Sequence, residues 1–303
     1  MSTDKNQTDR SSCCASCGVA EVDGDIKLKE CVDCDLVRYC SDACQENHKS
    51  QHEEACKKRV AELRDELLFK QPESTYLEDC PICCLPMPLD VQKSATYQCC
   101  SKVVCISCYY ISRRYLQHRC PFCREPTPST EKECEKQRMK RVEANDPVAL
   151  CEEAVKQYVK ADYSSAFEYF TRAAGLGDAE AHYQLSRMYY LGKGVEKDSE
   201  KELHHLEEAA IGGHPSARCG LGFQEYDNGN IERAVKHWII AATQGHDFSI
   251  KKLMEEFRSG TVNKDDLAAA LRAHQAAVDS AKSPQREEAE EYFENWININ
   301  AED

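Results

Sequence analysis

The cysteines are the residues of this sequence that could do the most chemistry. The chain has 20 of them in 303 residues, and all but Cys134, Cys151 and Cys219 lie before residue 124. The first twelve residues, MSTDKNQTDRSS, are polar and contain no apolar signal region, so we expect no secretion by that route. In the cytosol or nucleus thiols stay reduced, and clustered cysteines are metal ligands more often than disulfides. The cysteines therefore predict metal sites in a protein of the cytoplasm, the nucleus or both.

The first cluster, residues 13–56, contains four pairs of candidate ligands. Two cysteines separated by two residues can bind one ion from a tight turn, and a His-x-x-x-Cys pair lies on one face of a helix. Because Zn²⁺ takes four such ligands in a tetrahedron, eight ligands predict two closed structural sites with no open position. The candidates are Cys14, Cys17, Cys31, Cys34, Cys40, Cys44, His52 and Cys56. Two alternatives stay open: Cys13 could replace Cys14, and His48 could replace His52, although both give poorer spacing.

The spacing of this cluster resembles that of the MYND zinc finger. The resemblance runs from Cys14 to Cys56 and includes Tyr39 before Cys40. It implies that the first and third pairs bind one ion and the second and fourth pairs bind the other. One zinc would then be held by Cys14, Cys17, Cys40 and Cys44, and the other by Cys31, Cys34, His52 and Cys56. The resemblance also implies that the finger binds short proline-containing peptides rather than DNA.

The second cluster, residues 80–124, begins with Cys80-Pro-Ile-Cys83 and ends with Cys120-Pro-Phe-Cys123-Arg124. Cys99-Cys100 and Cys105-x-x-Cys108 lie between these two motifs. The stretch YYISRRYLQHR, after Cys108, is long enough for about three helical turns. Two distant CxxC knuckles with two more ligand positions between them again predict two tetrahedral zinc sites.

The second cluster resembles a RING finger over the whole of 80–124. The resemblance implies one ion held by Cys80, Cys83, Cys105 and Cys108, and another held by Cys99, Cys100, Cys120 and Cys123. The commonest RING pattern has a histidine where this chain has Lys102, which cannot bind metal while it is charged. We therefore expect Cys99 to supply the missing ligand. His118 is the alternative, and Cys84 is a further spare cysteine.

The RING resemblance also implies a partner, a ubiquitin-conjugating enzyme. In RING ubiquitin ligases the positions occupied here by Ile82 and Pro121 form an apolar shelf for that enzyme, and the arginine at position 124 contacts both the enzyme and ubiquitin. Such a ligase positions the reactants and supplies no nucleophile. Arginine suits this role because its planar fork can donate to two carbonyl groups at once. The alternative is that Ile82 and Pro121 only pack and that Arg124 is a solvated surface residue.

The C-terminal half of the chain carries an internal repeat. Small and apolar residues recur with offsets of 36 and then 32 residues, as in Ala174, Ala210 and Ala242; Gly177, Gly213 and Gly245; and Leu185, Leu221 and Leu253. A further unit starts at Asp146. This period, with a glycine turn after each pair of helices, predicts an α-solenoid. Residues 173–198 resemble the Sel1-like repeat, which implies a scaffold whose concave face binds peptides or proteins. The alternative is that the repeats only stabilise or space the zinc modules.

These motifs define the expected domains and fold class. The predicted fold is multidomain, with two small zinc-stabilised modules (MYND and RING cross-brace) followed by an all-α solenoid that is Sel1-like and related to tetratricopeptide repeats. Within the solenoid we expect a final helix at 264–282 and an acidic capping helix at 287–296, and in the linker a helix over 57–70. The expected parts are a disordered leader at 1–12, a MYND-type finger at 13–56, a helical linker at 57–79, a RING-type finger at 80–124, a charged connector at 125–144 and a repeat domain at 145–303.

Composition argues against several other functions. The formal net charge of -14 disfavours broad binding to nucleic acid or to a membrane surface, and the longest apolar run, 238–242, is too short to span a membrane. The sequence contains no dinucleotide-binding glycine motif, P-loop or nucleophile-elbow motif. The methyltransferase domain that accompanies some MYND fingers would need the space that the repeats occupy. The basic stretch 136–141 is flanked by glutamates, which favours a solvated charged helix over a nuclear signal.

The leading prediction is a zinc protein with four ions that acts as a RING-type ubiquitin ligase. Its MYND finger and helical repeats would select the substrate. The competing prediction is a non-enzymatic adaptor in which the fingers and the solenoid only bind partners. A transcriptional corepressor of the MYND type, which would require nuclear localisation, is the third prediction.

Overall fold

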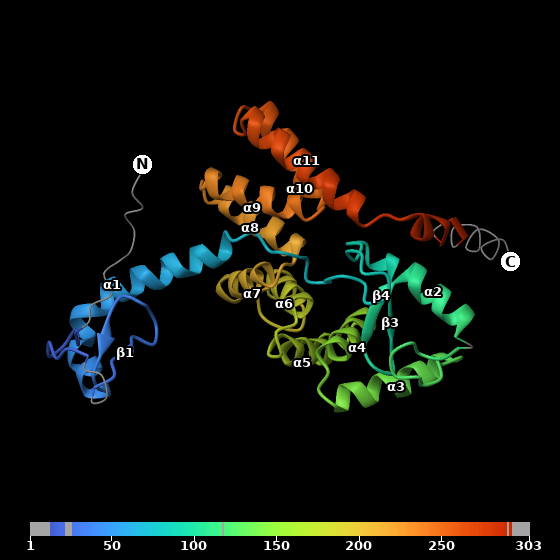
Figure 1. The fold of residues 1–303 in the computed structure, drawn as a ribbon, viewed down its shortest axis with the longest axis horizontal. Coiled ribbons are helices and arrows are strands. Elements are labelled where there is room, and N and C mark those ends of the chain that lie inside the picture. Colours follow the sequence, from blue (N-terminus) through green and yellow to red (C-terminus); the bar gives the residue numbers. More distant parts are fainter. Residues whose placement is uncertain (1–12, 22–25, 117, 290, 293–303) are drawn as a thin grey trace. The chain divides into compact units, whose positions relative to one another are not determined.

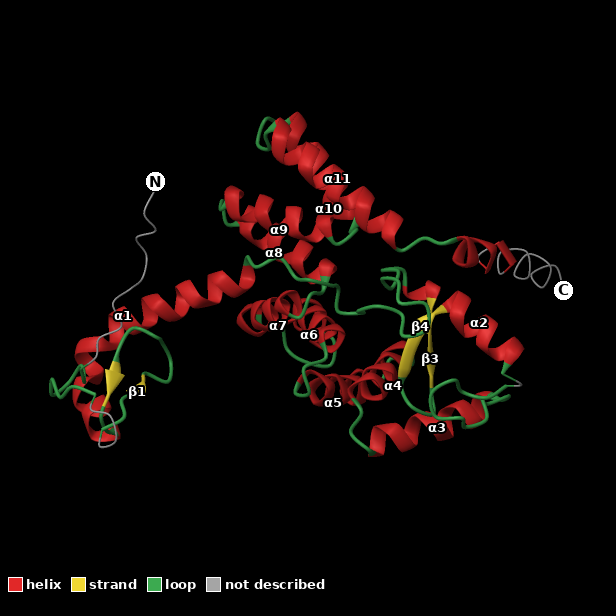
Figure 2. Cartoon of the chain, viewed as in Figure 1, coloured by secondary structure: helices red, strands yellow, loops and turns green. Residues whose placement is uncertain are grey.

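The structure, a computed structural model, describes residues 13–21, 26–116, 118–289, 291 and 292. The leader predicted at 1–12 lies outside these residues. The chain divides into two compact units, residues 1–70 and 71–303, which can be followed by colour in Figure 1. Figure 2 shows that helices dominate and that the strands are short.

The first unit contains a short β-hairpin followed by a long helix. Strand β1 (Lys29–Glu30) pairs antiparallel with β2 (Arg38–Tyr39). Helix α1 (Asp42–Leu68) follows, and the Ser41 side chain caps it by accepting a hydrogen bond from the backbone N–H of Cys44. The stretch 57–70, predicted as a separate helix, is the last part of α1 in the structure, because neither glycine nor proline interrupts the helix between its ends. Helix α1 ends shortly before Pro72, as expected because a proline disfavours helical backbone at the residue before it.

The second unit begins with a small module built on a hairpin and one helix. The short 3₁₀ helix η1 (Val91–Lys93) leads into β3 (Ser94–Tyr97), which pairs antiparallel with β4 (Lys102–Cys105). Helix α2 (Ile106–Tyr115) follows β4 directly, so it contains Cys108, whereas the sequence predicts a helix after that residue. The apolar core of the module contains Met87, Tyr97 and Val104 together with cysteines. A core of this size is too small to stabilise a fold by itself.

The rest of the second unit is mainly helical, and its helices pack in consecutive pairs: α4 with α5, α6 with α7, α8 with α9, and α10 with α11. Each pair also packs on the next, as a solenoid requires, so the predicted fold class is confirmed. The final helix predicted at 264–282 corresponds to α11. The bounds are α3 (Glu131–Glu143), α4 (Pro147–Val159), α5 (Tyr163–Ala174), α6 (Ala179–Leu191), α7 (Ser199–Ile211), α8 (Pro215–Asp227), α9 (Ile231–Thr243), α10 (Asp247–Arg258) and α11 (Lys264–Ser280).

The turns between repeats follow the predicted glycine pattern. Gly177, Gly213 and Gly245 have φ values of 86°, 82° and 86°, in the left-handed region that glycine adopts without steric cost. Asn145 takes the same place before the first unit, with a φ of 60°. Asparagine tolerates this region better than most residues, which explains why a repeat can begin at Asp146 without a glycine.

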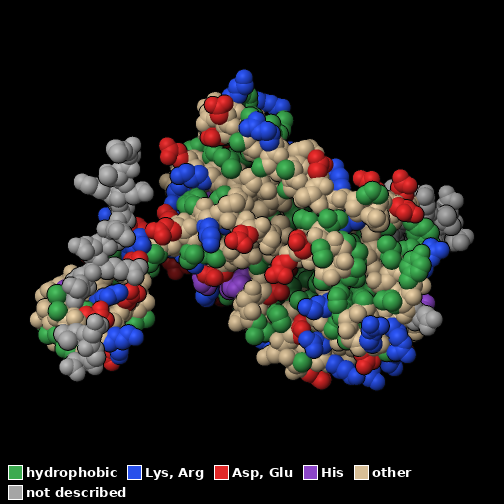
Figure 3. All heavy atoms as spheres, viewed as in Figure 1, with side chains coloured by type: hydrophobic (Ala, Val, Ile, Leu, Met, Phe, Trp, Pro, Cys, Tyr) green, Lys and Arg blue, Asp and Glu red, His purple; other side chains and the backbone are tan. Residues whose placement is uncertain are grey.

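The segment predicted as a charged connector, 125–144, contains α3, and this helix is part of the repeat core. Val142 is buried in the same apolar cluster as Leu150 of α4. Arg138 is also buried, and its Nε donates a hydrogen bond to Glu153 Oε2 at 2.9 Å. On the face seen in Figure 3, lysine and arginine side chains gather over α3. The basic stretch 136–141 is therefore part of a helix that packs on the repeat core.

The segment between α1 and the second module lies against the repeats. The backbone N–H of Tyr76 donates to the carbonyl oxygen of Gly213 at 3.2 Å, and the Tyr76 ring stacks on His214 with 4.4 Å between ring centroids. The helical linker predicted at 57–79 therefore divides, with residues up to 68 in α1 and residues 71–79 in the second unit.

At the C-terminal end, residues 284–289, 291 and 292 are helical, and the other positions of the capping helix predicted at 287–296 lie outside the described residues. Within the part of the chain that the structure describes, none of the helices carries an apolar stretch long enough to cross a membrane.

Candidate metal centres

The first unit brings together one group of four cysteine sulfurs within 4.8 Å of one another: Cys14, Cys17, Cys40 and Cys44. The turn before the hairpin supplies the first pair, the end of β2 precedes Cys40, and Cys44 lies in the first turn of α1. The Sγ atom of Cys40 is 3.5 Å from the sulfurs of both Cys17 and Cys44. Cys13, the alternative to Cys14, lies outside the group and forms a β-bridge with Ala20.

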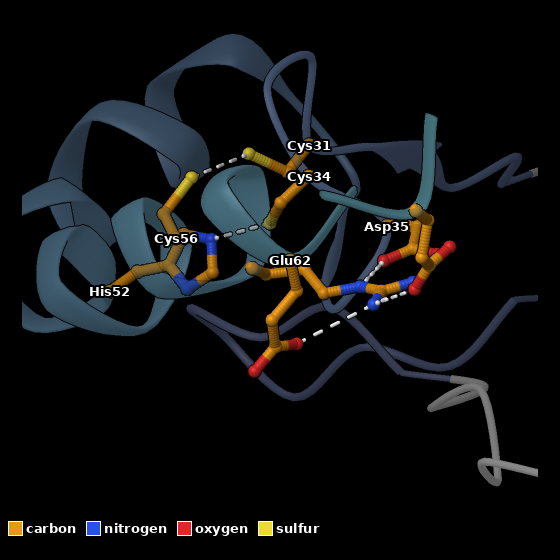
Figure 4. Close-up of polar contacts among 8 residues, drawn as sticks. Cys31, Cys34, Asp35, His52, Cys56 and Glu62 are labelled. Carbon is orange, nitrogen blue, oxygen red and sulfur yellow. Dashed lines mark hydrogen bonds and ion pairs between the residues drawn. The ribbon is translucent and has the colours of Figure 1, made fainter. Parts of the chain in front are cut away.

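A second group in the same unit contains Cys31, Cys34, His52 and Cys56. His52 and Cys56 lie one turn apart on α1 and point toward the two cysteines of the hairpin (Figure 4). The Sγ atoms of Cys31 and Cys56 are 3.9 Å apart, and His52 Nε2 is 3.2 Å from Cys34 Sγ. His48, the alternative to His52, lies outside the group. Its Nδ1 is 3.1 Å from the Tyr39 hydroxyl, and its ring stacks on that of His52.

An arginine of α1 braces the hairpin beside this second group. Arg59 donates two hydrogen bonds to the Asp35 carboxylate, from Nε at 2.8 Å and from Nη2 at 3.1 Å. Its Nη1 also donates to Glu66 at 2.9 Å. Because Asp35 follows Cys34 directly, this forked pair fixes the metal-binding turn to the helix. The role of Arg59 could not be predicted from the spacing of the cysteines, because Arg59 and Asp35 are 24 positions apart in the sequence.

The second unit brings together a third group: Cys80, Cys83, Cys105 and Cys108. Cys105 ends β4 and Cys108 lies in the first turn of α2, so the strand-to-helix junction presents both sulfurs to the opening knuckle. The Sγ atoms of Cys83 and Cys105 are 3.9 Å apart. The backbone N–H of Cys105 also donates to Cys80 Sγ at 3.4 Å.

A fourth group contains Cys99, Cys100, Cys120 and Cys123. The Sγ atoms of Cys100 and Cys120 are 3.7 Å apart, and those of Cys99 and Cys123 are 3.3 Å apart. The adjacent cysteines thus lie together with the closing knuckle. His118 lies outside the group, and its carbonyl oxygen accepts hydrogen bonds from Thr127 N–H and Oγ1 at 2.7 and 2.8 Å.

Three of the cysteine knuckles share one backbone geometry. The fourth residue after the first cysteine adopts a left-handed conformation, with φ of 76° at Gly18, 54° at Cys84 and 66° at Arg124. The N–H of this residue donates to the carbonyl oxygen of the first cysteine of its knuckle, at 2.9, 2.8 and 3.1 Å respectively. Cys84, the spare cysteine of the sequence, is the residue that closes this turn. It is exposed and lies outside the third group.

The donor atoms and their spacing fit zinc. A Zn–S bond of about 2.3 Å and a tetrahedral angle place two sulfurs of one ion about 3.8 Å apart. The neighbouring sulfurs within the four groups lie between 3.3 and 3.9 Å apart, and the cysteines are free thiols. Thiolate and imidazole are the ligands that zinc prefers, and four of them leave no open coordination position. The four groups are therefore compatible with structural zinc.

The cysteines of the first group differ in the pKa of their thiols. Burial raises the pKa of the Cys14 thiol, but hydrogen bonds from the backbone N–H groups of Cys17 and Cys40 outweigh burial and lower this pKa to about 6. Hydrogen bonds with the sulfurs of Cys17 and Cys44 raise the pKa of Cys40 to about 12. Metal binding must displace the protons that remain, so zinc affinity falls as pH falls.

The three residues that the RING resemblance assigns to the conjugating enzyme lie on the knuckles of the second module. Ile82 lies between the first two cysteines, and this residue is 38% exposed. Pro121 is half-buried beside Phe122, which is 36% exposed. The Arg124 side chain is exposed, and its carbonyl oxygen accepts a hydrogen bond from Arg119 Nη1 at 3.1 Å. The three side chains can therefore be reached from solvent.

Comparison with known families identifies two kinds of module. The family model of the MYND finger matches residues 14–56. The family model of the Sel1 repeat matches residues 156–178, 179–214 and 215–246. None of the curated proteins compared with the chain matches it. The matched segments do not include 80–124, so the RING interpretation of the second module rests on its residues and their geometry.

Among the solved structures that are similar to the chain are two whose folds have been named. A Sel1 repeat protein from Oxalobacter formigenes is 26% identical, with a TM-score of 0.44, over 52% of this chain and 67% of that one. A protective antigen of uropathogenic Escherichia coli strains, described as displaying an SLR fold, is 20% identical, with a TM-score of 0.39, over 55% of this chain and 37% of that one.

The chain thus combines an N-terminal zinc-finger region, which includes a MYND finger, with an all-helical Sel1 repeat solenoid. MYND fingers and Sel1 repeats mediate protein–protein interactions.

Proposed function

We propose that this protein is a RING-type ubiquitin ligase. Residues 80–124 would bind a ubiquitin-conjugating enzyme and hold its thioester-linked ubiquitin for transfer to a substrate. The observation that carries the proposal is the interleaved arrangement of eight cysteines, in which the first pair joins the third and the second joins the fourth. The exposed Ile82 and Arg124 lie on the two knuckles of this arrangement.

Catalysis in this proposal is positioning. No side chain of the module attacks the thioester. Ile82 and Pro121 would contribute apolar area to the enzyme interface, where a few well-placed side chains carry most of the binding energy. Arg124 would donate from its planar guanidinium to carbonyl groups of both the enzyme and ubiquitin, and so limit the orientations of the thioester. Bound zinc would supply a rigid frame only, since four protein ligands leave no position for substrate.

The remaining parts would select the substrate. We assign peptide binding to the MYND finger at 13–56 and protein binding to the repeat domain at 145–303, because modules of both kinds mediate protein–protein interactions. The cysteines of the four groups are not joined by disulfides, which suits a reducing compartment, so we place the activity in the cytoplasm, the nucleus or both.

The test is autoubiquitination by the full-length, zinc-loaded protein with a panel of conjugating enzymes. We expect activity with at least one enzyme, and loss of that activity in Ile82→Ala. The absence of activity across the whole panel, with protein shown to be folded and zinc-loaded, would reject the proposal.

Arg124→Gly isolates the role of the arginine side chain. Residue 124 has a left-handed backbone, which glycine adopts readily, so the substitution should leave the knuckle intact. Cys84→Gly is the matched control, because Cys84 closes the other knuckle of the module in the same way. We expect R124G to slow discharge of a thioester-linked ubiquitin by about tenfold or more and C84G to have little effect. Equal rates in the two variants would remove Arg124 from the mechanism.

The competing function is a non-enzymatic adaptor, which the two matched families favour because both of them mediate protein–protein interactions. An adaptor would form stable complexes that survive I82A and R124G unchanged. Pull-down of binding partners therefore separates the two functions only in combination with the ubiquitination assay on the same proteins. If the protein is a ligase, wild type is active, and the variants lose activity but still bind their partners. If it is an adaptor, wild type binds its partners and shows no ligase activity.

A further inference from the structure

The C-terminal segment of the repeat domain contributes a buried arginine to the third cysteine group. Arg286 lies in the helical stretch after α11 and is 4% exposed. Its Nη2 donates a hydrogen bond to Cys83 Sγ at 3.2 Å, between residues 203 positions apart in the sequence. An arginine therefore lies directly beside a candidate metal-binding sulfur.

The same guanidinium holds the loop that follows the knuckle. Its Nη2 donates to the carbonyl oxygen of Leu85 at 3.2 Å, and its Nη1 donates to that of Pro86 at 2.8 Å. Nη1 also donates to the carbonyl oxygen of Ala281, just after α11, at 2.6 Å. Arg286 thus connects the end of the solenoid to the loop that leads away from Cys83.

The segment around Arg286 also contacts α2. Ser107 Oγ donates to the carbonyl oxygen of Arg286 at 3.5 Å. Tyr110, one turn further along α2, packs on Tyr292 with 4.8 Å between ring centroids. Residues 283–289, 291 and 292 therefore contact both the knuckle and the helix that supply ligands to the third group. We call this segment the C-terminal clasp.

The charge of the site explains why an arginine belongs there. Four thiolates around one Zn²⁺ leave an excess of negative charge, and burying such a centre is costly unless charged hydrogen-bond donors compensate it. Arginine is always charged and can serve sulfur and carbonyl acceptors at once through its fork. Groups that donate hydrogen bonds to metal ligands orient them and strengthen metal binding.

We propose that Arg286 stabilises the zinc held by Cys80, Cys83, Cys105 and Cys108, and that the C-terminal clasp thereby couples retention of this zinc to the repeat domain. The proposal depends on zinc binding at this group and is independent of ligase activity. Arg286 acts as a positioning residue, since it touches the ligands and not the metal.

The test compares the rates at which zinc leaves the full-length protein in excess chromogenic chelator. In Arg286→Gln we expect one of the four zinc equivalents to be released about tenfold faster, with the other three unchanged. Arg286→Lys, which keeps the charge but loses the fork, should be intermediate. Arg272→Gln is the matched control, because Arg272 is exposed on α11, and it should behave as wild type.

Alkylation of cysteines during zinc release, mapped by mass spectrometry, identifies the site that opens. We expect Cys83 and Cys105 to be labelled early in R286Q, while Cys99 and Cys123 keep the wild-type rate. Unchanged zinc release, or equal acceleration at all four sites, would overturn the proposal. If R286Q does not fold, the R286K variant provides the test. Zinc release from R286K at the wild-type rate would contradict the proposed role of the guanidinium fork.

Discussion

Among single residues, the ligand groups could be predicted because spacing constrains local geometry. A CxxC pair fits one compact turn, and a His-x-x-x-Cys pair fits one helical turn, so both can be recognised without knowledge of the fold. Only the structure shows that Cys99 lies beside the other three cysteines of its group and that His118 does not, because β4 and α2 separate the two residues in the chain. The role of Cys84 also needed it, since a left-handed backbone at a non-glycine residue leaves no mark in the sequence.

A histidine pair in the repeats predicts a pH dependence of stability. The Nδ1 atoms of His182 and His205 lie 3.0 Å apart, and His182 Nε2 is 3.1 Å from the carbonyl oxygen of Ala174. His182 therefore donates from Nε2 and accepts at Nδ1 from His205. Burial, with the neighbouring His182, lowers the pKa of His205 to about 4.

The sign of the effect follows from this lowered pKa. An unfolded chain takes up a proton on His205 near pH 6.5, and the folded chain does so only near pH 4, so the stability of the wild type falls as pH falls between these values. We expect the stability advantage of wild type over His205→Gln to shrink from about pH 7.5 to about pH 5. Urea unfolding followed by circular dichroism measures this difference at each pH. An advantage that stays constant with pH would contradict this expectation.

Among the elements, the repeat helices could be predicted, whereas the packing of the charged helix α3 into the core could not. The solenoid helices recur with small residues at fixed offsets, which indicates how they pack. By contrast α3 is dominated by charge, and the burial of Arg138 is visible only once Glu153 is known to lie opposite it. Because the two charges compensate each other, removing either partner would leave a buried charge unpaired and cost about 3–5 kcal/mol.

The turn between α4 and α5 contains a strained residue that a substitution can relieve. Ala161 has a φ of 63°, and Gly229 has a φ of 80° at the equivalent turn between α8 and α9. The left-handed region is unfavourable for alanine and free of steric cost for glycine. We expect Ala161→Gly to stabilise the protein by about 0.5–1 kcal/mol and Gly229→Ala to destabilise it by about 1 kcal/mol. Urea unfolding measures both changes, and destabilisation by A161G would show that strain at this turn is not the dominant effect.

For the molecule as a whole, the sequence predicts the order of modules but not how the second module is attached to the repeats. That attachment depends on contacts between residues far apart in the chain. Gln98 donates to Glu152 of α4 at 2.9 Å, and Arg286 reaches Cys83 from beyond α11. Such contacts have no periodicity and no local spacing, so no pattern reveals them. These contacts fix the candidate enzyme-binding module to the repeat domain. Independent domains joined by a linker would make no such contacts.

The number of zinc ions per chain tests most directly whether both cysteine modules are metal centres. Purified full-length protein, measured by metal analysis against a quantitative protein concentration, should contain four zinc ions, one for each cysteine group. Cys99→Ser should lower this number to about three, because it removes one of four ligands from a single group. A folded wild-type protein with about two zinc ions would mean that one module folds without metal, and would contradict the assignment of structural zinc to both modules.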